Sequence, residues 1–170
     1  MHLCYPPCPL ATLIWIKRTA RRGYRQPRNS ATLAAMTNPS HFELLLQAAA
    51  SQPEPQRLLF VFAGAELPAD ATPAQRERFE AGQGGALTPL ACVDKAVDEV
   101  ASFDALVAES HDASAPWQVV FIAGLAGQGG RPPSTALVDS ALQAMVENVR
   151  TDRFSGYLAL GPDGEPLSFS

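Results

Sequence analysis

The sequence predicts an α/β fold with elements in the layered order α-β-α-β-α-β-α-β-β, a mainly parallel sheet and a C-terminal antiparallel hairpin. The segments 57–64 and 118–123, each apolar after its first residue, are typical of strands that are covered on both faces. Apolar residues elsewhere recur at helical spacing. This alternation of helices with strands favours parallel strand pairing.

The composition changes at Met36, and the change predicts the domain organisation. Residues 1–35 carry six basic side chains and no acidic one, whereas residues 36–170 carry seven basic and all 17 acidic side chains. We expect residues 36–170 to form a single acidic α/β domain of about 135 residues, enough to bury a core without a disulfide. We expect residues 1–35 to be a poorly ordered basic leader. It either results from a start assigned upstream of Met36, which we favour, or is an organellar transit peptide.

The first helix and strand are marked by local signals. Ser40 and Glu43 have the spacing of a capping box, in which each side chain satisfies a backbone N–H of the other residue. The helix that they begin should end at the proline-rich segment 52–55. The apolar run 57–64 then predicts the first buried strand.

A second capping box at Thr72 and Gln75 predicts a short helix that ends near Ala81. Residues 86–93 suggest the next strand. Pro89 lacks a backbone N–H, so this strand should lie at an edge of the sheet or contain a bulge. A third helix should follow, capped by Ser102.

The C-terminal half continues the alternation with a strand at 118–123 and a long helix that begins at Ser134 or Thr135. This helix carries one apolar stripe, made by Val138, Leu142, Met145 and Val149. The last two strands, 156–160 and 166–169, should form a hairpin about the Gly-Pro-Asp-Gly turn at 161–164.

Charge and composition exclude several classes of function. An acidic domain disfavours nucleic acid and anionic membrane surfaces, because both are bound through Lys and Arg. No apolar run approaches the roughly 18–20 residues of a membrane helix. Residues 36–170 contain a single cysteine, Cys92, which fits a reducing cytoplasm. No His/Cys/Asp spacing suggests a metal site, and we expect no cofactor.

A glycine-rich loop is the candidate ligand site. Gly124, Gly127, Gly129, Gly130 and Arg131 follow a buried strand and precede a helix. Glycines allow backbone amides to converge on an anion, and an arginine can grip a phosphate or carboxylate. The loop lacks the Lys-Ser/Thr of a P-loop and the glycine spacing of the dinucleotide fingerprint. The alternative is a flexible surface loop.

Cys92 is the candidate catalytic nucleophile. Lys95, three residues later, could lower the pKa of a nearby thiol, and His111 or His41 could serve as a base. The alternative is a buried structural thiol.

Glu66, Asp94 and Asp98 could form paired carboxylates, because open α/β sheets place their sites at strand ends. The alternative is that all three are solvated loop carboxylates. Neither the pattern around Cys92 nor these three carboxylates match a known catalytic motif.

Three segments carry a family resemblance: Arg57–Leu67, Phe79–Lys95 and Pro116–Phe121. The chain from about Ser40 onward resembles a small uncharacterised proteobacterial family commonly labelled "ribonucleotide reductase subunit alpha". The family brings no established catalytic residues. Ribonucleotide reduction in a catalytic alpha subunit needs a thiyl-forming cysteine and a further redox pair. The single cysteine of residues 36–170 therefore argues against that activity.

Together these observations predict a small cytoplasmic module without enzymatic activity. We expect its partner to be a protein or a small anionic ligand, and homo-oligomers are compatible with this expectation. The alternative function is a small thiol-dependent enzyme that uses Cys92.

Overall fold

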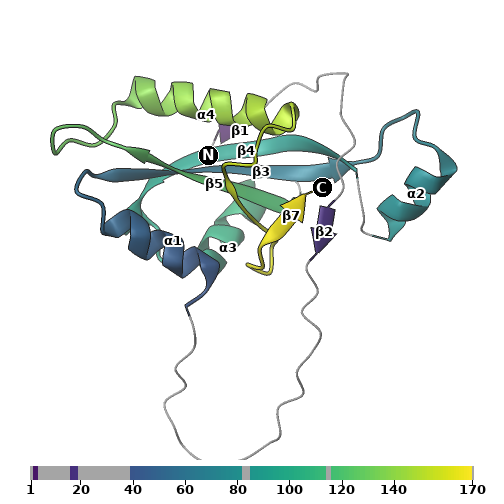
Figure 1. The fold of residues 1–170 in the computed structure, drawn as a ribbon, viewed down its shortest axis with the longest axis horizontal. Helices are drawn as coiled ribbons and strands as arrows, with labels where there is room; N and C mark the ends of the chain where they lie inside the picture. Colours follow the sequence, from purple (N-terminus) through teal and green to yellow (C-terminus); the bar gives the residue numbers. More distant parts are fainter. Residues whose placement is uncertain (1, 4–15, 19–38, 82–84, 114–115, 170) are drawn as a thin grey trace, which may run out of the picture.

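The computed structural model describes residues 2–3, 16–18, 39–81, 85–113 and 116–169. A five-stranded sheet lies between helices on both of its faces (Figure 1), and a separate two-stranded sheet joins β2 and β7. The helices are α1 (His41–Ala50), α2 (Pro73–Glu80), α3 (Phe103–Ala113) and α4 (Thr135–Arg150), with a 3₁₀ turn at Val97–Glu99. The strands are β1 (His2–Leu3), β2 (Ile16–Arg18), β3 (Gln56–Glu66), β4 (Ala86–Ala96), β5 (Val119–Ala126), β6 (Leu158–Leu160) and β7 (Leu167–Phe169).

The prediction of a mainly parallel sheet is wrong. The strand order is β1-β4-β3-β5-β6, and every adjacent pair in it is antiparallel. Strands β5 and β6 are antiparallel although α4, which packs on the sheet, lies between them in the sequence. Helix α2 accounts for the β3–β4 part of the error, because none of its residues is buried and it lies beside the sheet rather than on a face (Figure 1). It therefore belongs to an arm within a β3–β4 hairpin and makes no crossover. Strands β4 and β5 do run in the same direction, but β3 lies between them.

Local sequence signals place the helix starts as expected. Ser40 Oγ accepts from the Glu43 amide at 3.1 Å, and the Ser40 amide donates to the Glu43 carboxylate at 2.7 Å. The second capping box, between Thr72 and Gln75, is also present. Ser134 accepts from a backbone amide in the first turn of α4. These caps satisfy N–H groups that the helix itself leaves without partners.

The core has two layers because β3 alternates its side chains between two covered faces. Leu59 and Val61 point to the α4 face, where the predicted apolar stripe of α4 is buried. Phe60 and Phe62 point to the opposite face, which α1 and α3 cover. Both phenylalanines are fully buried. Burying a side chain of this size stabilises a fold by about 1.5–3 kcal/mol.

Strand β4 contains the bulge that Pro89 predicts. Phe62 pairs with Ala91 whereas Ala63 pairs with Pro89, so Leu90 is an extra residue in β4. The insertion places Leu90 and Ala91 on the same face of the sheet. A bulge at this point accommodates a residue that cannot donate to the strand ladder.

The C-terminal strands separate after their turn. The Gly164 amide donates to the Gly161 carbonyl at 2.9 Å, which closes the turn. Beyond it, Pro166 forms a single bridge with Leu160, and β7 pairs with β2 instead of extending β6. Phe169 packs on Phe154 with ring centroids 4.8 Å apart, so β7 lies over the α4-side core.

Candidate functional site

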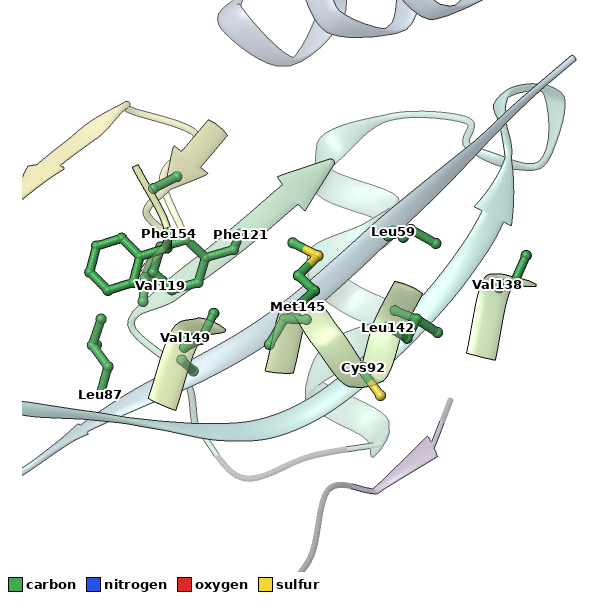
Figure 2. Close-up of a cluster of buried hydrophobic side chains, with 13 residues drawn as sticks. Leu59, Leu87, Cys92, Val119, Phe121, Val138, Leu142, Met145, Val149 and Phe154 are labelled. Carbon is green, nitrogen blue, oxygen red and sulfur yellow. The ribbon is translucent and has the colours of Figure 1, made fainter. Parts of the chain in front are cut away.

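Cys92 lies in β4 and is 8% exposed. Figure 2 shows it on the α4 side, beside Leu142, within the cluster that also contains Leu59 and Met145. An apolar surrounding of this kind is typical of a structural thiol.

The other two candidate catalytic residues lie on the opposite side of the sheet. Lys95 Nζ lies 2.9 Å from a carboxylate oxygen of Glu109 in α3, on the face away from α4. His111, near the end of α3, stacks on Trp117 with ring centroids 6.1 Å apart. Neither side chain shares a layer with Cys92, so the sheet backbone separates the thiol from both candidate partners. His41 is exposed at the start of α1.

The glycine loop forms a tight turn. Gly129 and Gly130 have φ values of 63° and 73°. Two successive positive φ angles are those of a type I′ turn, which glycine adopts without strain. The Gln128 and Arg131 amides each donate to the other residue's carbonyl, at 3.0 and 3.3 Å. The loop is thus a small hairpin that precedes α4.

Other amides of this loop also have acceptors within the protein. The Gly130 amide donates to the Glu54 carboxylate at 2.7 Å, and the Gly127 amide donates to the Pro55 carbonyl at 2.8 Å. The amide of Gly130 was expected to bind an anion, but it already donates to the carboxylate of Glu54. The Arg131 side chain is exposed. An added anion at Gly130 would have to displace Glu54.

Gly127 is required for a close backbone approach. An added Cβ there would lie 1.9 Å from the Arg131 carbonyl oxygen. Gly124 was predicted to belong to the loop, but it lies in β5, which extends to Ala126. There the nearest atom to an added Cβ is a side-chain oxygen of Gln56 at 3.6 Å, an ordinary contact. The two positions, three residues apart, thus have opposite tolerance for a side chain.

The three candidate carboxylates do not meet at one strand end. Asp94 accepts from Arg57 Nε at 2.6 Å, and Glu99 lies 3.6 Å from the same guanidinium. The hydrogen bond with Asp94 raises the pKa of Arg57, assisted by the charges of Asp94, Glu99 and Asp98. Glu66 lies at the other end of β3, where it accepts from Thr88 at 3.1 Å. Arg57, Asp94 and Glu99 therefore form an ion-pair cluster at one end of the sheet. Glu66 lies outside this cluster.

Two features escaped the sequence interpretation. Glu54 binds a loop 76 residues away along the chain, and no local pattern could indicate that contact. The second feature is the outer edge of β4, which is the side of the strand that faces away from β3. Strand β4 has eleven residues and pairs with β3 along most of its length. Among the described residues, its outer edge pairs only at Ala91 and Cys92, with β1. Pro89 indicated an edge position, but not the length of the edge.

Within the described ranges, no group of His, Cys, Asp and Glu side chains could hold a metal ion. None of the described helices is long and apolar enough to cross a membrane.

The fold defines a small three-layer α/β domain with an antiparallel sheet. No family model, curated protein or solved structure matches the chain.

Proposed function

We propose that this protein is a non-enzymatic module that associates with a protein partner through the outer edge of β4. An open strand edge presents unpaired N–H and C=O groups and is a template for another strand. The single observation that carries the proposal is the contrast between the two sides of β4. Its inner side pairs with β3 from Ala86 to Ala96, whereas among the described residues its outer side pairs with two residues of β1.

The geometry of the candidate catalytic groups supports the absence of enzymatic activity. Nucleophilic catalysis needs a nucleophile and a base within hydrogen-bond reach. Cys92 is buried beneath α4, while Lys95 and His111 contact groups on the α3 side. The Gly130 amide of the glycine loop donates to Glu54 of the same chain. The loop therefore has fewer amides available for a small anionic ligand than its sequence suggested. A protein partner is therefore favoured over a small anion.

A cytoplasmic location belongs to the same proposal. Residues 36–170 contain one cysteine, and it is buried. Proteins of oxidising compartments commonly use disulfides in domains of this size, whereas cytoplasmic proteins keep their thiols reduced.

Residue-resolved hydrogen exchange of the full chain at low micromolar concentration tests the edge. In an open edge strand, alternate amides point outward and exchange fast, while amides bonded to the neighbouring strand exchange slowly. We expect this alternation along β4, away from Ala91 and Cys92. Strand β3 between Arg57 and Ala63 is the control, because both of its sides are paired there and its amides should all be slow. Uniform protection of β4 in a monomer would mean that the edge is covered, and the proposal would be wrong.

A further inference from the structure

The outer edge of β4, which pairs only with β1 among the described residues, lies beneath one flank of α4. On this face of the sheet, α4 covers β3 and β4, while Phe154 and Phe169 cover β5. Asn148 donates to the Tyr157 hydroxyl at 2.8 Å, and Tyr157 directly precedes β6. The Asn148 side of α4 therefore faces the β6 edge of the sheet. The other flank of the helix faces the β4 edge.

That flank carries Asp139, Val146 and Arg150. These residues are spaced seven and four apart, so they lie along one side of the helix. Asp139 is exposed, while Val146 and Arg150 are half-buried. Neither charged side chain forms an ion pair with another residue in the part of the chain that the structure describes. The flank thus has a negative end, an apolar middle and a positive end.

We propose that the partner at this edge is a second copy of the chain, related by a two-fold axis perpendicular to the sheet. The two β4 strands pair antiparallel, and the two α4 helices lie side by side above them. This inference rests on the proposed use of the β4 edge. It explains why the helix flank above that edge is self-complementary in charge.

A two-fold axis perpendicular to the sheet keeps both α4 helices on the same face of the joined sheet. The axis makes the helices antiparallel, which places Asp139 of one copy opposite Arg150 of the other, twice per dimer. Val146 lies between these pairs. Pairing along β4 displaces β1 from Ala91 and Cys92.

A charge-swap experiment on the full chain tests the dimer by sedimentation equilibrium. Asp139→Arg and Arg150→Asp each replace two attractive contacts by two repulsive ones, so each should weaken dimerisation about tenfold. The double variant restores both pairs in reversed order and should return the dissociation constant to within about threefold of the wild type. Glu147→Lys, on the solvent side of α4, is the matched control and should leave the constant unchanged.

The outcomes separate this inference from the proposed function. A wild-type chain that stays monomeric at about millimolar concentration, or a double variant no better than the single ones, overturns the dimer. If β4 amides still exchange in alternation under those conditions, the edge is open and the proposed function stands with another protein partner. If Arg150→Asp lowers the melting temperature, Arg150→Gln is used instead; it removes the attraction and should weaken the dimer about threefold.

Discussion

Cys92 and Lys95 are three residues apart on β4, and their side chains point to opposite faces of the sheet. This relationship follows from the two-residue repeat of a strand, which places residues i and i+3 on different sides. It separates the candidate nucleophile, Cys92, from Lys95, the cation that was expected to lower its pKa.

The reactivity of Cys92 should therefore be independent of Lys95. We expect Cys92 to resist iodoacetamide in the native protein at neutral pH and to react on unfolding, because burial limits access to the thiol. Lys95→Met should leave the native rate unchanged. Peptide mapping by mass spectrometry distinguishes Cys92 from Cys4 and Cys8. Fast native alkylation that Lys95→Met slows would revive the thiol-enzyme hypothesis.

Gly127 in the glycine loop and Gly124 in β5 offer a matched pair of substitutions. Gly127→Ala should lower the free energy of unfolding by about 1–3 kcal/mol, because the new methyl group overlaps the Arg131 carbonyl. Gly124→Ala should be neutral or slightly stabilising, since its Cβ has room and alanine restricts the unfolded chain. Urea denaturation measures both. Equal effects would contradict the close approach seen at Gly127.

The end of α4 contains a residue in the left-handed conformation. Asp152 has φ 59°, and the Arg153 amide donates to the Asn148 carbonyl at 2.8 Å, as in a Schellman motif. We expect Asp152→Gly to be about 1–2 kcal/mol more stable than Asp152→Val, because only valine resists this conformation. Both variants lose the aspartate side chain, so the difference between their stabilities reports the cost of the left-handed backbone conformation. Thermal unfolding checks the order, and a more stable valine variant would refute it.

The parts of the fold that depend on neighbouring residues were predictable, and the parts that depend on distant ones were not. Capping boxes join residues three apart, so the starts of α1 and α2 were identified correctly. Strand direction depends on which edges pair. One available signal was α2, whose only large apolar side chain, Phe79, could not cover a sheet as a crossover helix must.

The prediction that Lys95 lies near Cys92 was wrong for a related reason. The strand containing Cys92 was expected to end at Val93, which left Lys95 in a loop with no defined direction. The structure extends β4 to Ala96, so Lys95 has a fixed face. The partner of the glycine loop, Glu54, could only be found from the folded chain.

Residues 1–35 are expected to contribute little to stability. The described part of this segment is β1 and β2, which add backbone pairing to β4 and β7. Ordering a residue costs about 1–2 kcal/mol, which offsets the net gain of about 0.5–1.5 kcal/mol from each hydrogen bond. A chain that begins at Met36 should therefore melt at the temperature of the full chain. A loss of about 4 °C, equivalent to about 1 kcal/mol, would show that the segment stabilises the domain.

Glu54 is the natural competitor for any anion at the glycine loop. Its carboxylate accepts from the Gly130 amide at 2.7 Å, a charge-assisted bond that should contribute about 1 kcal/mol to folding. Glu54→Ala should lose this contribution, whereas Glu54→Gln keeps an acceptor and should lose less. Because Glu54 is already in place, millimolar phosphate or acetate should not raise the melting temperature of the wild type. A concentration-dependent rise that Arg131→Ala abolishes would instead establish an anion site, since a ligand of the native state stabilises by mass action.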